Sequence, residues 1–317
     1  MALAATKPPT RIFQGEKGRL LYGDNRGAMA SLLPELRGKV TLAYMDPPFL
    51  TARAHEVILK DKAIPKVGPL KARPKKFAFD DRWAGGKAEY LEALGQRLVL
   101  VRELLAPHGS VIIHIDPKTS HYVKVLCDEI FGDEAFASEI VWRYRRWPSK
   151  TPNFQRVHDV LLRYRRDPKA APRWNTLYEP LAASTLATWG TKKQRAVVEK
   201  DGRRSRSSST DEPTKGVPMG DVWDIGVIAP ISRERTGYPT QKPEALLERL
   251  VTALSSEGDI VLDPYAGSGT TLAVAARLGR SFVGIDQSEE AVAIATSRLE
   301  AQGEKLVRFD AHVARSA

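Results

Sequence analysis

The sequence predicts an α/β fold built on a doubly wound, mostly parallel sheet. Apolar runs of strand length alternate along the chain with segments whose apolar residues recur at helical spacing. Several of these apolar runs end in an aspartate, as at Asp46, Asp263 and Asp286. The run that ends at Asp263 continues into a glycine-rich turn that opens a helix, which is typical of ligand-binding turns in this fold class. The chain has 317 residues, 42% of them hydrophobic, which is enough to bury such a core.

The first half of the chain supplies three predicted strands and three predicted helices. The clearest helix is 87–106, where Tyr90, Leu94, Leu98 and Val101 fall on one face. The segment before it, 50–81, is rich in Lys and Pro and reads as a loop. In chain order, the predicted elements are strand 18–24, helix 27–36, strand 39–46, loop 50–81, helix 87–106, strand 109–116 and helix 120–132.

The second half begins with two strand-like runs that we predict to form a hairpin. Residues 190–216 then break the pattern: they are polar, basic and rich in serine, which predicts a mobile loop or a small irregular subdomain. The last helix is expected to begin at Ser288, a capping residue followed by an acidic first turn. In order, the predicted elements are strands 138–146 and 158–166, helix 243–255, strand 258–263, a helix from 270, strand 280–286 and helix 288–300.

Composition narrows the possible functions. No apolar run reaches the roughly 18 residues of a membrane span, and the N-terminus lacks a secretory apolar stretch, so we expect a cytoplasmic protein. The single cysteine, Cys127, excludes an internal disulfide. The histidines show no metal-ligand spacing, and we predict no metal. The net charge of +11 predicts a polyanionic partner, and residues 143–216 carry that whole excess, with 18 Lys and Arg against 7 Asp and Glu.

The strand 39–46 ends in the sequence DPPF at residues 46–49. Proline cannot donate to a strand ladder and fixes its own backbone angle. The strand therefore stops, and Asp46 and Phe49 are expected on a rigid platform at its carboxyl end. Taken alone, the motif fits an ordinary turn with a capping aspartate equally well.

Three classes of ligand compete for the turn DPYAGSGTT at residues 263–271. A P-loop needs a lysine after the second glycine, where Thr270 stands, and a dinucleotide turn needs a third glycine, where Leu272 stands. S-adenosylmethionine suits the turn because its carboxylate fits a helix amino end and its ribose needs a carboxylate from the next strand. Asp286 lies 23 residues after Asp263, in the place for that acid, although a capping role for the following helix is an alternative.

Together these motifs resemble those of the amino-directed DNA methyltransferases of the β arrangement, which modify adenine N6 or cytosine N4. GRLLYGDN, DPPF, GSVIIHID, HDVLLRYRR, RTGYPTQKP, LDPYAGSGTT and SFVGIDQS follow in that family's order over almost the whole chain. The chain departs from the family at Phe49, more often Tyr, and at Tyr265, more often Phe. The resemblance implies a Rossmann-like, S-adenosylmethionine-dependent methyltransferase fold with an antiparallel hairpin and a basic target-recognition insertion.

The resemblance also implies a bacterial protein associated with the nucleoid, a function for each part of the chain and a role for each motif. Residues 1–142 would form the catalytic half, 143–220 the target-recognition region and 221–317 the cofactor half. Asp46 and the Pro47 carbonyl would accept the two hydrogens of the target amino group, and Phe49 would stack on a base flipped out of the duplex. The implied catalytic residues are Asp46, Pro47, Pro48 and Phe49, and the implied cofactor-binding residues are Asp24, Asp46, Thr240, Gln241, Lys242, Asp263, Pro264, Tyr265, Gly267, Ser268, Gly269, Thr270 and Asp286.

Within those sets, Tyr265 would flank the cofactor sulfonium and Asp24 would lie near its adenine, with helix capping as the alternative for Asp24. The aromatic residue of DPPF favours adenine N6 over cytosine N4. C5-cytosine chemistry is disfavoured because Cys127 follows a leucine in an apolar helical stretch instead of a proline in a loop.

Double-stranded DNA is the predicted partner, because RYRRWPSK (143–150) interleaves arginines with aromatic residues. The alternative for residues 143–150 is an ordinary solvated basic face. The basic segment 53–76 is expected to lie beside the DNA. An RNA or protein-glutamine methyltransferase, or a non-catalytic DNA-binding module, are the competing functions, and a homodimer and a separate restriction endonuclease are left open. The predicted DNA-binding residues are Arg143, Arg145, Arg146, Trp147, Lys150, Arg156, Arg203 and Arg204.

Overall fold

The computed structural model of this chain describes residues 7–51, 53–58, 75–148, 150, 152–195, 197–203 and 208–310. The chain divides into two compact units. The larger unit comprises Met1–Trp174 and Asp221–Ala317, and the smaller unit is Asn175–Gly220. The predicted target-recognition region, 143–220, is therefore divided between the units: residues 143–174 belong to the larger unit and 175–220 form the smaller one.

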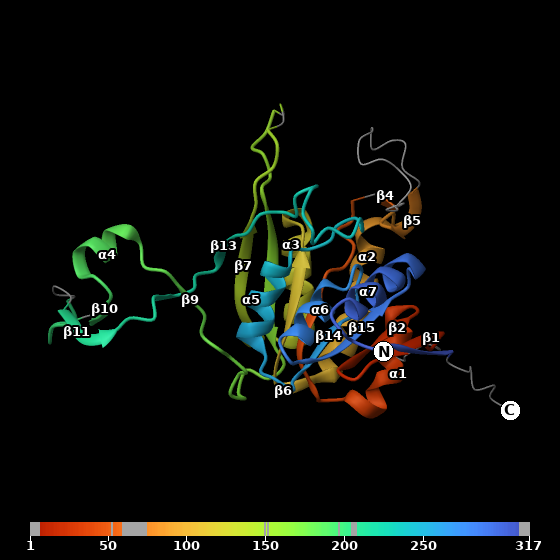
Figure 1. The fold of residues 1–317 in the computed structure, drawn as a ribbon, viewed down its shortest axis with the longest axis horizontal. Coiled ribbons are helices and arrows are strands. Elements are labelled where there is room, and N and C mark those ends of the chain that lie inside the picture. Colours follow the sequence, from red (N-terminus) through yellow and green to blue (C-terminus); the bar gives the residue numbers. More distant parts are fainter. Residues whose placement is uncertain are drawn as a thin grey trace. The chain divides into compact units, whose positions relative to one another are not determined.

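The larger unit contains a ten-stranded sheet. Figure 1 shows strands of this sheet between the helices. Five neighbouring strands, β6, β3, β14, β15 and β2, run parallel, and β7 and β8 form an antiparallel hairpin at one side. Both features confirm the predicted fold class. The strand order is β13 (Val222–Asp224), β7 (Phe136–Arg143), β8 (His158–Arg165), β6 (Leu105–Ile115), β3 (Val40–Met45), β14 (Ile260–Asp263), β15 (Ser281–Asp286), β2 (Gly18–Tyr22), β1 (Arg11–Gln14) and β16 (Val307–Asp310).

Helices cover both faces of the parallel strands (Figure 1). Strand β3 is buried at all six positions, as expected for a parallel strand covered on both sides. One layer packs α1 against α2 and α2 against α3, and the other packs α5 against α6 and α6 against α7. The first layer consists of α1 (Asn25–Leu36), α2 (Gly86–Leu104) and α3 (Pro117–Phe131), and the second of α5 (Glu244–Leu254), α6 (Thr270–Arg277) and α7 (Glu289–Glu300).

Local signals explain where several helices begin and end. Helix α3 follows Asp116, whose carboxylate accepts a hydrogen bond from the Lys118 amide at 2.8 Å, and stops at Gly132, which has a φ of 89°. Ser288 caps α7 as the sequence predicted. Cys127 on α3 is fully buried, which confirms the predicted packing role, and its burial raises the pKa of the thiol.

Two parts of the larger unit differ from the sequence prediction. The segment predicted as a loop contains the antiparallel ribbon β4 (Ala54–Ile58) and β5 (Lys75–Asp80). Lysines and the exposed Phe77 interrupt the alternation of apolar and polar residues that would indicate a strand. Strands β1 and β16 were also unpredicted, and β16 is exposed at all four positions. Within the basic segment 53–76, residues 59–74 lie outside the described residues.

The smaller unit has secondary structure of its own. Its elements are α4 (Ala183–Trp189), the pair β9 (Tyr178–Glu179) and β12 (Val217–Pro218), and the pair β10 (Lys192–Arg195) and β11 (Ser208–Pro213). Of the two alternatives for 190–216, this arrangement matches the small subdomain. Across the described part of the chain, no helix has the length and hydropathy needed to cross a bilayer.

Candidate active site

The carboxyl ends of three neighbouring parallel strands meet at one cavity of about 230 Å³. Strand β3 leads into Asp46, and β14 and β15 end at Asp263 and Asp286. Because β3 and β14 are adjacent in the sheet, two motifs 217 residues apart in sequence line the same space. This is the point where the strand order reverses, the usual ligand position in an open α/β sheet.

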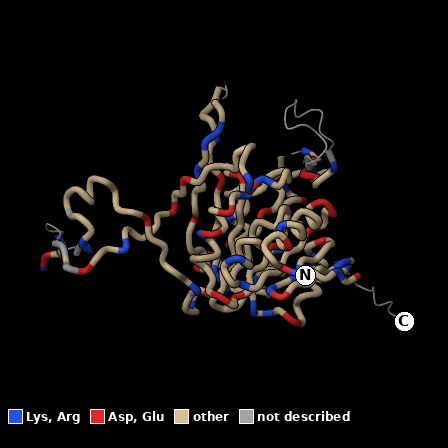
Figure 2. Tube along the Cα trace, viewed as in Figure 1, with Lys and Arg blue, Asp and Glu red and all other residues tan. Residues whose placement is uncertain are grey.

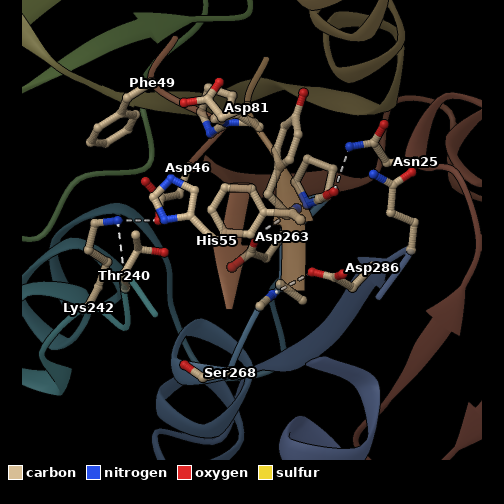
Figure 3. A pocket seen from close by; sticks show the side chains of 18 of the residues that line it. Asn25, Asp46, Phe49, His55, Asp81, Thr240, Lys242, Asp263, Ser268 and Asp286 are labelled. Atoms are coloured by element: carbon tan, nitrogen blue, oxygen red, sulfur yellow. Dashed lines mark hydrogen bonds and ion pairs between the residues drawn. The ribbon is translucent and has the colours of Figure 1, made fainter. Parts of the chain in front are cut away.

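Asp46 is the predicted catalytic residue with the most distinctive surroundings (Figure 3). The Lys242 ammonium donates to its Oδ2 atom and also to the Thr240 carbonyl oxygen at 3.3 Å. The other oxygen, Oδ1, is buried and has no hydrogen-bond partner among the described residues. One carboxylate oxygen is therefore fixed by a cation, while the second has no partner among the described residues, and Asp46 itself lines the cavity. A buried acceptor without a partner is costly, so such an atom calls for a functional explanation.

A buried chain of polar side chains lies against Asp46. The Tyr44 hydroxyl lies 2.7 Å from His114 Nδ1, and His114 Nε2 lies 3.3 Å from the Asp159 carboxylate. Burial alone would raise the pKa of Asp159, but hydrogen bonds from His114 and from the Tyr144 hydroxyl hold it below its ordinary value. His114 Nδ1 is 4.0 Å from Asp46 Oδ1, beyond hydrogen-bond range. His114 is thus held by groups other than Asp46, which leaves Oδ1 available.

The other DPPF residues also line the cavity. The Phe49 ring lies 5.2 Å from Lys242 Nζ and 5.6 Å from the His114 ring, and one side of it packs against the core. Pro47 and Pro48 line the same wall, which places the rigid platform where the sequence predicted it.

The glycine turn is tied directly to the acid of the next strand. Asp286 accepts hydrogen bonds from the amides of Gly267 and Ser288, each at 2.8 Å, and burial raises the pKa of Asp286 to about 6. Gly269 has a φ of 72°, and a Cβ there would lie 2.7 Å from Ala295 Cβ on α7. Gly269 therefore permits close packing between the turn and α7, and it is not among the residues that line the cavity.

Asp263 has a supporting position in the same wall. Asp263 is 2% exposed, and its carboxylate accepts hydrogen bonds from the Tyr265 amide at 3.0 Å and from the Thr271 side chain. Burial raises the pKa of Asp263 to about 7. Tyr265 lines the cavity, and burial raises the pKa of its hydroxyl to about 12, so the ring stays neutral.

Most of the predicted cofactor residues line the cavity, whereas Asp24 and Gly269 do not. Asp24 caps α1 through the amides of Arg26 and Gly27, and it pairs with Arg97 at 2.9 Å. Its neighbour Asn25 lines the cavity instead and donates to the Pro264 carbonyl at 2.9 Å. The predicted residues that line the cavity are Asp46, Pro47, Pro48, Phe49, Thr240, Gln241, Lys242, Asp263, Pro264, Tyr265, Gly267, Ser268, Thr270 and Asp286.

Sequence reasoning did not find several lining residues that come from other elements. They include Asn25, His55, Asp81, Trp83, Arg97 and Tyr238. The unexpected ribbon β4–β5 and its flanks supply His55, Asp81 and Trp83, so these could not be placed before the fold was known. Among the described residues, no group of three or more His, Cys, Asp or Glu side chains is arranged to hold a metal ion.

The predicted DNA-binding residues lie mainly in the connection between β7 and β8, where Lys and Arg gather in Figure 2. Trp147 is 93% exposed, and Arg145, Arg146 and Lys150 are exposed beside it. Arg143 and Arg156 instead pair with Asp224 at 2.5 Å and Asp116 at 2.6 Å. Arg203 belongs to the smaller unit, and Arg204 lies outside the described residues.

The fold and the position of the cavity define an α/β protein of the class found in solved DNA methyltransferases. The structure resembles the cytosine-N4-specific PvuII DNA methyltransferase with a TM-score of 0.57 and 16% identity, over 92% of this chain and 89% of that one. It resembles the M1.HpyAVI–SAM complex with a TM-score of 0.51 and 18% identity, over 88% of this chain and 98% of that one. Residues 40–297 match the family model for the N6/N4 methyltransferases, described as DNA methylase. The chain therefore belongs to this DNA methylase family, which confirms the resemblance seen in the sequence.

The chain is also similar in sequence to individual methyltransferases. The type II methyltransferase M.HpaI of Haemophilus parainfluenzae is 30% identical over 214 residues, which is 68% of this chain and 60% of the relative. The DNA adenine methyltransferase YhdJ of Escherichia coli K12 is 28% identical over 293 residues, which is 92% of this chain and 85% of the relative. The match spans less than two thirds of M.HpaI and 66% of M.EcaI of Enterobacter cloacae.

Proposed function

We propose that this chain is an S-adenosylmethionine-dependent DNA methyltransferase that acts on the exocyclic amino group of a base in duplex DNA, with adenine N6 preferred over cytosine N4. The observation that carries the proposal is that Asp46, which has one buried oxygen without a partner among the described residues, lines the same cavity as the glycine turn. The exocyclic amino group needs an acceptor for its hydrogens, and the methyl donor must bind next to that amino group.

The residues of the second wall fit S-adenosylmethionine. The turn approaches the cavity without a side chain at Gly267, whose φ is 50°, and Asp286 offers a carboxylate from the adjacent strand. Asn25 and Tyr265 add an amide and an aromatic face. When bound, the cofactor would supply its sulfonium methyl group as the electrophile. The residues assigned to it are Thr240, Gln241, Lys242, Asp263, Pro264, Tyr265, Gly267, Ser268, Thr270 and Asp286, with Asn25 taking the place first assigned to Asp24.

In this proposal the DPPF platform prepares the amine. Asp46 Oδ1 and the Pro47 carbonyl accept the two amino hydrogens, which draws the nitrogen towards tetrahedral geometry and frees its lone pair. Lys242 keeps Asp46 in place, since its ammonium holds Oδ2. The Asp46 carboxylate stabilises the positive charge that develops on the nitrogen. Phe49 stacks on the base, and stacking of about 1–3 kcal/mol offsets part of the cost of unstacking it from the duplex.

The hairpin β7–β8 supplies the proposed DNA contact. The exposed Arg145, Arg146 and Lys150 suit phosphates, and the exposed Trp147 and Phe154 suit stacking on bases. Arg143 and Arg156 contribute less, because carboxylates already pair with them. The homodimer and the separate restriction endonuclease stay predictions.

The proposal is tested by incubating the chain with methyl-tritiated S-adenosylmethionine and genomic DNA, then separating the nucleosides. We expect the label in N6-methyladenine. Label in N4-methylcytosine would support the alternative base with the same mechanism. Unlabelled DNA, or label only in RNA or protein run in parallel, would contradict a DNA methyltransferase.

A further inference from the structure

We propose that Asp81 is a positioning residue that fixes the turn after Phe49 and thereby orients the Phe49 ring in the cavity. The proposal rests on the function proposed above. Asp81 follows β5, at the root of the ribbon that the sequence did not predict, and it is fully buried in the cavity wall (Figure 3).

The Asp81 carboxylate collects four hydrogen bonds from three residues. Oδ1 accepts from the Leu50 amide at 3.0 Å and from the Trp83 indole at 3.2 Å. Oδ2 accepts from the Thr51 amide at 2.6 Å and from the Thr51 hydroxyl at 2.7 Å. All four partners are donors, so both carboxylate oxygens act as acceptors. Two of these bonds hold consecutive backbone amides directly after Phe49.

The turn held by Asp81 has a backbone conformation that it would not adopt without help. Leu50 has a φ of 56°, which lies in the left-handed region that residues other than Gly, Asn and Asp rarely adopt. Such a conformation persists only where the surroundings impose it. The amides of Leu50 and Thr51 donate hydrogen bonds to Asp81, and these two bonds hold Leu50 in the left-handed conformation.

The direction of the chain at Leu50 determines where Phe49 points. Pro47 and Pro48 fix the backbone on one side of Phe49, and the Asp81 bonds fix it on the other. The ring is thereby held 5.2 Å from Lys242 Nζ, next to the pair formed by Lys242 and Asp46. A loosened turn would let the ring move relative to Asp46, and a shift of about 1 Å at a substrate-positioning group can cost about a hundredfold in rate.

The test combines a weakened clamp with two substitutions in the turn. In Asp81→Asn, an amide NH₂ replaces one acceptor and faces donors, so the turn loosens and kcat for methyl transfer falls by about tenfold to a hundredfold. Adding Leu50→Gly removes the penalty of the left-handed conformation, whereas adding Leu50→Ala shortens the side chain similarly and keeps that penalty. We expect D81N/L50G to exceed D81N/L50A in kcat by about threefold or more.

The matched control is Asp128→Asn on α3, a carboxylate that accepts from Lys124 and Tyr164 and does not line the cavity. It should keep the parental kcat. Cofactor affinity, measured by calorimetry, should be unchanged in D81N. Parental kcat in D81N, or equal kcat with Gly and Ala at position 50, would overturn the proposal.

Two further measurements test the role of Asp81 if D81N does not fold or if the parent chain has no methyltransferase activity. If D81N does not fold, Thr51→Val removes one bond to Asp81, and parental kcat in that variant would count against the clamp. If the parent chain methylates no DNA, the proposed function fails, but amide hydrogen exchange still tests the clamp. The Leu50 and Thr51 amides should exchange faster in D81N than in the parent, and equal rates would refute it.

Discussion

At the scale of single residues, each of two carboxylates in the cavity has a defined set of partners. One oxygen of Asp46 accepts a hydrogen bond from Lys242, and the other has no partner among the described residues. Asp286 accepts hydrogen bonds from two backbone amides and also lines the cavity. We assign Asp46 to the amine and Asp286 to the cofactor. The two roles are separable by mutation, because the side chains end different strands.

Asp286→Ala should weaken S-adenosylmethionine binding by about tenfold or more, because a charge-assisted hydrogen bond is worth roughly 1.5–3 kcal/mol. DNA binding should be largely kept, since the hairpin β7–β8 does not contain this residue. Calorimetric titration with each ligand separately measures both effects. Unchanged cofactor affinity would remove Asp286 from the site.

Asp263 gives a prediction about pH. Burial raises its pKa to about 7 from an ordinary 3.8, so between those values the folded chain binds a proton that the unfolded chain does not. Stability from this group therefore falls as pH rises through that window, by on the order of 4 kcal/mol in total. Asp263→Asn, which is neutral throughout, should be more stable relative to the parent at pH 8 than at pH 5. Urea unfolding at the two pH values measures this, and a pH-independent difference would contradict it.

At the scale of elements, the sequence predicted those with strong periodicity or capping and missed those without. Strand β3 and helix α2 bury continuous or one-sided apolar surface, which a pattern reveals. The ribbon β4–β5 and strand β16 are exposed or lysine-rich, and their pairing partners are distant in sequence or lie across a long connection. Asp81 could not be identified beforehand because its role depends on a turn around Leu50 that only the folded ribbon explains.

The close contact between the glycine turn and α7 predicts a position-specific cost. Gly269→Ala would place a Cβ 2.7 Å from Ala295 Cβ, while Gly258, with a φ of 82°, has nothing within 4 Å of an added Cβ. Gly258→Ala and Gly269→Ala should each lower the free energy of unfolding by about 1–2 kcal/mol because of the left-handed backbone, and Gly269→Ala should lower it by about 1–3 kcal/mol more because of the clash. Urea unfolding of the two variants isolates the contact, and equal losses would show that α7 moves away freely.

At the scale of the whole molecule, the excess positive charge and the cavity belong to different parts of one chain. The parallel strands hold the cavity at their carboxyl ends, and the basic hairpin extends from the same sheet. The fold class could be predicted because the order of the motifs is visible in the sequence. The partners of Arg143 and Arg156 could not be predicted, because their carboxylates come from β13 and the start of α3.

DNA binding should depend steeply on salt. If about six phosphates are neutralised, log affinity falls with log salt at a slope near −5. Arg145→Gln with Lys150→Gln should reduce the magnitude of that slope by about 2, because both side chains are exposed on the hairpin. Arg143→Gln is the control and should change it less, since Asp224 already pairs with Arg143. Fluorescence anisotropy across a salt series measures the slopes, and equal changes would contradict this assignment.

Asp46, as the acceptor for the target amine, is the residue on which the proposed catalysis depends most. The direct measurement is single-turnover transfer of a tritiated methyl group to duplex DNA by the parent and by Asp46→Ala, with cofactor saturation checked by calorimetry. We predict that Asp46→Ala binds S-adenosylmethionine and transfers no measurable methyl group. Transfer at the parental rate by that variant would contradict the catalytic assignment.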